Sequence, residues 1–115
     1  MALYDSARPN PAGHRDLAVA DLSLPAQGFR LVDVREPAEF TGELGHIPGA
    51  ALVPLAQVMA QAVNWSKEEP LVLVCKSGGR SGNAAQALSR AGFSKVMNLV
   101  GGMIAWNAAG KTIEK

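Results

Sequence analysis

The sequence predicts an α/β fold in which a mostly parallel central sheet of about five strands carries helices on both faces. Strand-like apolar runs and helix-like segments alternate four or five times along the 115 residues, with short links between them. The central runs, above all Leu71–Val74, are continuously apolar, which is typical of parallel strands covered on both faces. The length itself predicts a single domain with one well-filled core.

The strands are expected where apolar residues cluster between turn signals. The first residues contain Pro9, Pro11 and Gly13, so residues 1–13 are expected to form an extended lead-in to a folded domain over residues 14–115. Within that domain, strands are expected at residues 14–19, 28–34, 50–53, 71–74 and 95–99.

Helices are expected between these strands. Proline is favoured at a first helical position, and Pro37 and Pro54 each stand where a helix is expected to begin. After Pro54, apolar residues recur at helical spacing. The helical segments are expected at residues 20–24, 38–40, 54–62, 80–90 and 104–106.

Composition excludes several classes of function. The chain is 48% hydrophobic and 18% charged with net charge +1, and it has no basic run, so nucleic acid is not an expected partner. No apolar stretch approaches the roughly 20 residues of a membrane span, and the N-terminal residues lack the apolar segment of a secretory signal. A single cysteine cannot form an internal disulfide, which favours a reducing, cytoplasmic location.

That single cysteine, Cys75, ends the apolar strand and is followed by a glycine-rich turn and a helix. Cations and helix N-termini lower the pKa of a thiol and so generate the reactive thiolate. Lys76 and Arg80 provide cations, and Gly78 and Gly79 let the loop curl until its N–H groups converge on one point. The pattern predicts a nucleophilic thiolate beside a site for a small dianion.

Other polar residues are expected to have structural roles. Asp33 and Arg35 end a buried strand, and we interpret them as an ion pair or hydrogen-bonded brace near the loop. His46 stands alone in a turn without companion ligands, so no metal site is expected. The sequence has no glycine-rich dinucleotide fingerprint, and no cofactor is expected.

Four segments of the chain resemble the signatures of single-domain rhodaneses, which are sulfurtransferases. The loop Cys-Lys-Ser-Gly-Gly-Arg-Ser at residues 75–81 is similar to their active-site loop. Residues 33–40, 45–50 and 98–106 are similar to three further signatures, in the same order and spacing. The resemblance covers about residues 16–110.

The resemblance implies a ping-pong reaction through a persulfide on Cys75. The thiolate would attack the outer sulfur of a donor such as thiosulfate, and a thiophilic acceptor such as cyanide or a thiol would then take that sulfur. With one cysteine there is no internal resolving thiol, so the acceptor must be external. The residues expected to bind the substrate are Lys76, Ser77, Gly78, Gly79, Arg80 and Ser81.

Two alternatives belong to other classes of function. The first is a rhodanese-like persulfide carrier or binding module that serves a partner protein. The second is a phosphatase or arsenate reductase, whose longer loop holds five residues between cysteine and arginine, whereas four separate Cys75 from Arg80 here. The shorter loop favours sulfur transfer, and a monomer or weak homodimer is expected.

Overall fold

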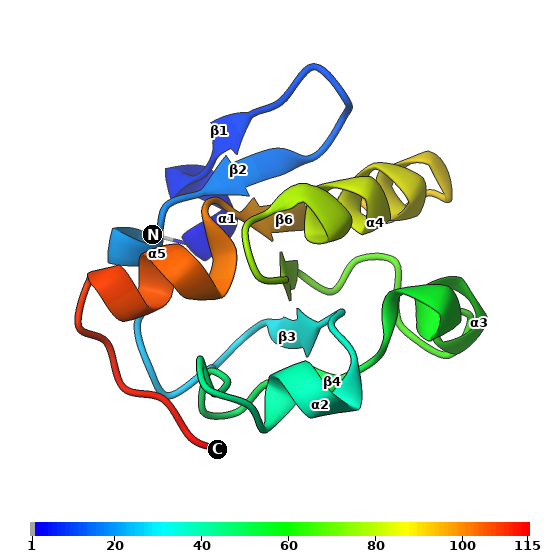
Figure 1. Ribbon diagram of the computed structural model, residues 1–115. Coiled ribbons are helices and arrows are strands. Elements are labelled where there is room, and N and C mark those ends of the chain that lie inside the picture. The colour runs from blue at the N-terminus through cyan, green and yellow to red at the C-terminus, as the bar shows by residue number, and fades with distance from the viewer. Residues whose placement is uncertain (1) are drawn as a thin grey trace.

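The computed structural model describes residues 2–115 and is built around one six-stranded sheet (Figure 1). The strand order is β1-β2-β6-β5-β3-β4. The strands are β1 (Arg8–Pro9), β2 (Arg15–Leu17), β3 (Arg30–Asp33), β4 (Ala51–Leu52), β5 (Leu71–Val74) and β6 (Val96–Leu99). The α-helices are α1 (Leu3–Ser6), α2 (Pro37–Phe40), α3 (Val58–Ala62), α4 (Gly79–Arg90) and α5 (Gly102–Ala108), and 3-10 turns span Val19–Asp21 and Leu55–Gln57.

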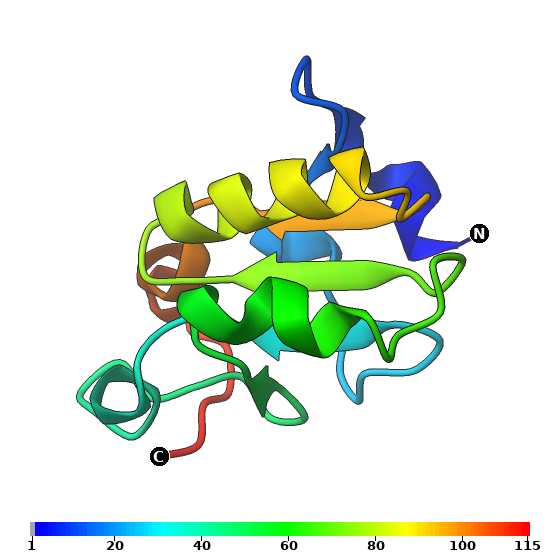
Figure 2. The ribbon, with the colours of Figure 1, turned by 90° about the vertical axis from the view of Figure 1, so that its right-hand side faces the viewer.

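Strand β5 lies near the middle of the sheet, between β3 and β6, and pairs in parallel with both. Figure 2 shows the central strands running in one direction, so that their carboxyl ends meet at one edge. This edge faces the viewer in Figure 1. The fold prediction is therefore confirmed, with a sixth strand added.

The side chains of β5 alternate between two hydrophobic cores. Leu71 and Leu73 pack with residues of α3 and α4 on one face of the sheet. Val72 and Val74 point to the other face, where Met103 and Trp106 of α5 belong to the same core. All of these side chains are at most 1% exposed, which explains why the strand is apolar at every position.

The lead-in is more structured than the sequence indicates. Residues 3–6 form α1, so the expectation of an extended segment through residue 13 is wrong for these four residues, whereas β1 is extended and pairs antiparallel with β2. The Arg15 guanidinium donates to the Tyr4 carbonyl and lies over the Tyr4 ring, which ties the segment to the sheet. The domain boundary at residue 14 stays a prediction.

Two further elements differ from expectation. The run at residues 50–53 forms only the two-residue strand β4 at the edge of the sheet, where Ala51 is exposed and Leu52 only partly buried. The helix after Pro54 begins as a 3-10 turn and becomes α-helical at Val58. Over residues 2–115, no helix combines the length and apolar character needed to cross a membrane.

Candidate active site

Cys75 directly follows β5 at the carboxyl edge of the sheet, and its side chain is 1% exposed. The chain then turns through Gly78, which has a φ of +106° that side-chain-bearing residues rarely adopt, and enters α4 at Gly79. This turn brings the Gly78 N–H to 3.0 Å from the Cys75 sulfur, to which it donates a hydrogen bond. The glycine turn thus aims the start of α4 at the sulfur.

Opposing influences act on the pKa of Cys75. Burial, the largest influence, raises it, but hydrogen bonds from the Ser81 side chain and from the N–H groups of Ser81, Gly78 and Ser77 lower it, and the net result lies below the usual value. The sequence predicts that the thiol is activated both by the cations Lys76 and Arg80 and by the N–H groups of residues 77–81. In the structure, the leading influences that lower the pKa are hydrogen bonds from the loop and from the first turn of α4.

Ser81 and Asn98 form a buried polar pair beside the sulfur. The Ser81 hydroxyl lies 3.3 Å from the Cys75 sulfur and 2.6 Å from Asn98 Oδ1, and either of these can accept its single proton. The amide of Asn98 also donates to the Gly78 carbonyl at 3.2 Å. Asn98, which belongs to strand β6, therefore contacts both Ser81 and Gly78.

The N-terminus of α5 supports the loop from the other side. Met103 N donates to the Cys75 carbonyl at 2.9 Å, and Ile104 N donates to the Lys76 carbonyl at 3.0 Å. A Cβ on Gly102 would stand 2.3 Å from the Cys75 carbonyl oxygen, so only glycine permits this approach. The absence of a side chain at Gly102 thus lets the start of α5 pack against Cys75.

Arg80 does not present a free guanidinium to a donor. Its two terminal nitrogens donate to the two carboxylate oxygens of Glu39 on α2, at 2.7 and 2.9 Å. This pairing raises the pKa of Arg80 and lowers that of Glu39 to about 2. The expectation that Arg80 binds the substrate stays a prediction, and in the structure both terminal nitrogens of Arg80 are already bound to Glu39.

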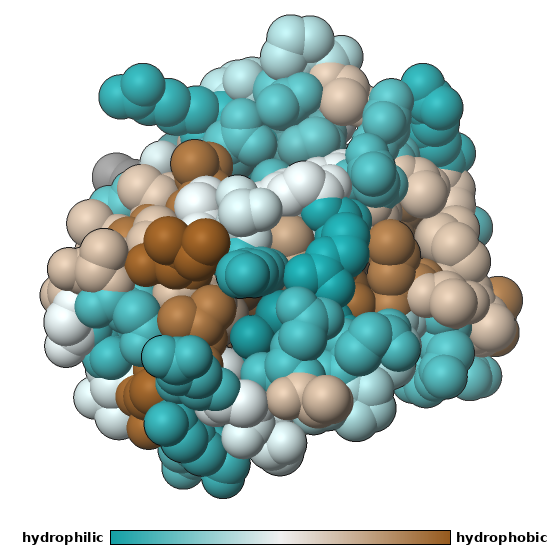
Figure 3. Space-filling view, viewed as in Figure 1, coloured by the Kyte–Doolittle hydropathy of each residue, from teal (hydrophilic) through white to brown (hydrophobic). Residues whose placement is uncertain are grey.

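A pocket of about 370 Å³ opens between α2, the cysteine loop and α5. Cys75 itself, buried beneath the loop, does not line it. The side chains that line it include Arg35, Glu39, Glu43, Leu44, Lys76 and Ile104. Figure 3 shows this face of the molecule, where a hydrophilic strip crosses the centre and hydrophobic side chains flank it. Lys76 is exposed, as a residue that attracts an anion must be.

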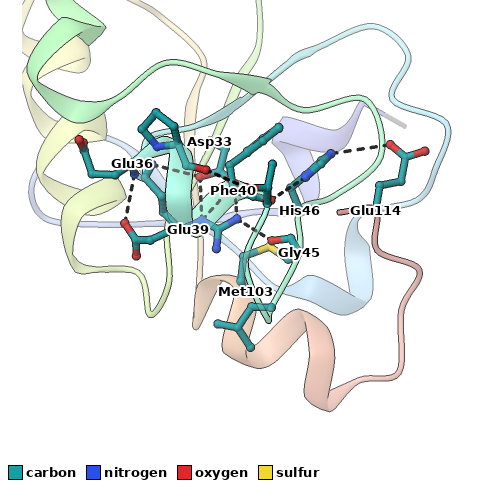
Figure 4. Close-up of polar contacts among 12 residues, drawn as sticks. Asp33, Glu36, Glu39, Phe40, Gly45, His46, Met103 and Glu114 are labelled. Atoms are coloured by element: carbon teal, nitrogen blue, oxygen red, sulfur yellow. Dashed lines mark hydrogen bonds and ion pairs between the residues drawn. The ribbon is translucent and has the colours of Figure 1, made fainter.

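Asp33 and Arg35 form a buried ion pair behind the pocket. The Arg35 guanidinium donates to both carboxylate oxygens of Asp33 and also to the Gly45 carbonyl at 2.7 Å. Figure 4 shows Asp33 and Gly45, the two residues to which Arg35 donates, close to one another. The geometry is that of a brace between β3 and the loop after α2; the supporting role itself stays a prediction.

His46 belongs to the same region but has a different set of partners. Its ring stacks on Phe40 with centroids 3.7 Å apart, and Nδ1 donates to the Phe40 carbonyl at 2.8 Å (Figure 4). Glu114 lies 3.8 Å from Nε2. Among residues 2–115, no group of three or more His, Cys, Asp or Glu side chains is placed to hold a metal ion.

The structure thus brings the predicted loop residues together and adds two residues that the sequence reasoning missed. Asn98 interrupts an apolar strand, and a polar residue in a buried strand is a signal that could have singled it out. Glu39 gives no comparable signal. It is recognisable only as the partner of Glu36 in the capping box of α2, and the contact with Arg80 joins residues 41 positions apart.

Comparison with known proteins identifies the family. Residues 18–109 match the family model of the rhodanese-like domain, and the chain belongs to this family. It is 40% identical to the thiosulfate sulfurtransferase GlpE of Shewanella oneidensis over 73% of this chain and 81% of that protein. It is 38% identical to the putative sulfur carrier protein YrkF of Bacillus subtilis over 75% of this chain and 44% of that protein.

Among solved structures, a rhodanese-like domain protein from Staphylococcus aureus aligns with a TM-score of 0.72 at 29% identity, covering 87% of this chain and 98% of that one. Several curated relatives are longer. The chain spans 44% and 64% of the lengths of the two relatives that share 45% and 43% identity with it.

Proposed function

We propose that this domain is a sulfurtransferase that carries a sulfane sulfur on Cys75 as a persulfide. The observation that carries the proposal is the buried thiol whose pKa is lowered by hydrogen bonds from Gly78, Ser77 and Ser81. Such a site stabilises a negative charge on sulfur, which is what both a thiolate and a terminal persulfide require.

In the first half-reaction the Cys75 thiolate attacks the outer sulfur of thiosulfate. A bond forms between Cys75 Sγ and that sulfur while the sulfur–sulfur bond of thiosulfate breaks, and sulfite departs with the bonding pair. The thiolate and thiosulfate together carry a charge of minus three. The products, a persulfide anion and a sulfite dianion, carry the same total charge, so no proton is needed. The exposed Lys76 attracts the anionic donor, and the Gly78 N–H supports the charge left on sulfur.

In the second half-reaction a thiophilic acceptor attacks the outer persulfide sulfur and releases the Cys75 thiolate. Cyanide leaves as thiocyanate, and a thiolate leaves as a new persulfide. Because the sequence has one cysteine, the acceptor comes from outside the chain. The single cysteine has no partner in the chain for a disulfide, which favours a reducing compartment such as the cytoplasm for this reaction.

A second candidate is a persulfide carrier that receives or delivers sulfur only to a protein partner. The similarity to the putative sulfur carrier protein YrkF favours it, as does the exposed apolar surface beside the loop at Val100 and Ile104. The two candidates share the Cys75 persulfide and differ in the partner. Turnover with free thiosulfate and cyanide supports the enzyme, and transfer that needs a protein partner supports the carrier.

The deciding experiment is intact-protein mass spectrometry after incubation with thiosulfate, followed by cyanide. The expected result is a gain of one sulfur atom that cyanide then removes as thiocyanate. Cys75→Ser is the matched control and must gain nothing, and residual transfer in that variant would overturn the mechanism. Hydrolysis of an aryl phosphate by the wild-type protein would instead support the phosphatase alternative.

A further inference from the structure

The carboxylate of Glu39 is held in place independently of its partner Arg80. Glu39 belongs to the capping box of α2, where its Oε1 accepts the backbone N–H of Glu36 at 3.1 Å. The same oxygen accepts the hydrogen bond from Arg80 at 2.7 Å. Helix α2 therefore presents a fixed anion to the cysteine loop, and Arg80 has docked onto it.

This ion pair shares its electrostatic environment with the reactive sulfur. Arg80 directly precedes Ser81, whose hydroxyl lies 3.3 Å from the Cys75 sulfur, and the negative charges of Cys75 and Asp33 help to raise the pKa of Arg80. Glu39 also lines the pocket beside Lys76, the residue next to Cys75. An anionic donor that enters this pocket meets Lys76 together with the Glu39 carboxylate, to which Arg80 is already bound.

The pair is nevertheless open to exchange. The side chains of Arg80 and Glu39 are 37% and 32% exposed, and ion pairs with such exposure are weak because water solvates the separated charges well. The pKa of Glu39, about 2, keeps its carboxylate charged throughout the physiological range. A dianion can therefore bind Arg80 only by displacing the Glu39 carboxylate, which is charged throughout this range.

We propose that Glu39 is a specificity-determining residue, which occupies Arg80 and so disfavours dianionic sulfur donors relative to monoanionic ones. The favoured class comprises thiosulfonates and alkyl persulfides, in which the transferred sulfur carries the only negative charge at the reacting end. This inference rests on the proposed sulfurtransferase function and assigns the charge of its preferred donor.

Two donors of similar size and different charge provide the test. Thiosulfate is a dianion, and methanethiosulfonate replaces one of its charged oxygens by a methyl group. Glu39→Gln removes the competing charge while keeping a residue that can form a capping box. The KM for thiosulfate is expected to fall by about three- to tenfold, the range expected when a weak surface ion pair no longer competes. The KM for methanethiosulfonate is expected to change by less than about twofold between wild type and this variant.

The matched control is Glu43→Gln, which removes the same charge from the same pocket without a contact to Arg80. It is expected to shift both KM values equally and by less than about twofold. An unchanged KM for thiosulfate in Glu39→Gln, an equal fall for both donors, or the same selective fall in Glu43→Gln would each overturn the proposal.

Direct binding separates this inference from the proposed function. Calorimetric titration of thiosulfate into Cys75→Ser, with and without Glu39→Gln, measures donor affinity without any transfer of sulfur. If neither donor yields a persulfide on the wild-type protein, the proposed function fails. Tighter thiosulfate binding in the double variant then still supports the role of Glu39, and equal binding overturns it.

Discussion

Two arginine–carboxylate pairs lie within one region of this domain and differ above all in their access to water. Asp33 and Arg35 are 0% and 1% exposed, and the Arg35 guanidinium has a second partner in the Gly45 carbonyl. Glu39 and Arg80 form an equally well-shaped bidentate pair, but about a third of each side chain is exposed. Similar geometry therefore has different consequences.

Burial decides which pair can change during a reaction. Separating Asp33 from Arg35 would leave two charges without water, so this pair is expected to stay intact during a reaction. Separating Glu39 from Arg80 leaves two charges that water solvates, so a ligand can replace either partner. The comparison indicates that Arg80, five residues after Cys75, can exchange its carboxylate partner for a ligand, whereas the buried Arg35 is expected to keep its partner.

The largest expected effect is on stability, from breaking the buried pair. Asp33→Asn leaves the Arg35 charge buried without a counterion, and loss of one partner from such a pair typically costs about 3–5 kcal/mol. Chemical denaturation followed by circular dichroism measures this change. Glu39→Gln is the control and should cost less than about 1 kcal/mol. Similar losses in the two variants would remove the distinction between the pairs.

The next largest effect is on donor use, from removing the exposed arginine. Arg80→Ala deletes a guanidinium near the sulfur and leaves the Glu39 charge uncompensated at the pocket. The KM for thiosulfate is expected to rise by about tenfold, equivalent to about 1.4 kcal/mol, with little loss of stability. Steady-state kinetics with cyanide as acceptor measures it. In the Glu39→Gln background the rise should be larger, because Arg80 is then free to bind the donor.

A third prediction concerns the Cys75 thiol. Ser81→Ala removes the hydroxyl beside the sulfur and is expected to raise the pKa of Cys75 toward its usual value. The rate of alkylation by iodoacetamide as a function of pH measures this, and its midpoint should move to higher pH. Ser77→Ala is the control, since Ser77 acts on the sulfur through its backbone N–H. Equal midpoints in wild type and Ser81→Ala would exclude the hydroxyl from activation of the thiol.

Much of the fold could be predicted from local patterns. The apolar run at Leu71–Val74 indicates a strand covered on both faces, and the glycine turn after Cys75 indicates a tight entry into a helix. The lead-in escaped prediction because β1 is stabilised by pairing with β2 and by contacts such as Arg15 with Tyr4, not by its own composition. Its prolines are compatible with an edge strand as well as with a loop.

The site was predictable where its residues are contiguous and unpredictable where they are not. The loop from Cys75 to Ser81 carries its own geometry, so the convergence of its N–H groups on the cysteine follows from the sequence. The occupation of Arg80 does not follow from it, because Glu39 reaches the loop only through the packing of α2 against it. Asn98 reaches the same loop from a strand that is adjacent in the sheet and distant along the chain.

The smallest expected effect tests the exposed pair by pH. The pKa of Glu39 in the folded protein is lowered from 4.5 to about 2. A carboxyl whose pKa is lowered by folding stabilises the native state at pH values above its unfolded pKa, and this contribution is lost as the pH falls through the folded value.

The free energy of unfolding of wild type should therefore exceed that of Glu39→Gln at pH 6, by less than about 1 kcal/mol because the pair is partly solvated. The difference should shrink between pH 4.5 and about 2, the interval between the two pKa values. Urea denaturation of both variants at several pH values measures it, and taking the difference cancels the other carboxyl groups. A difference that does not change with pH would mean that Glu39 and Arg80 are not paired in solution, and Arg80 would then be free to bind the donor.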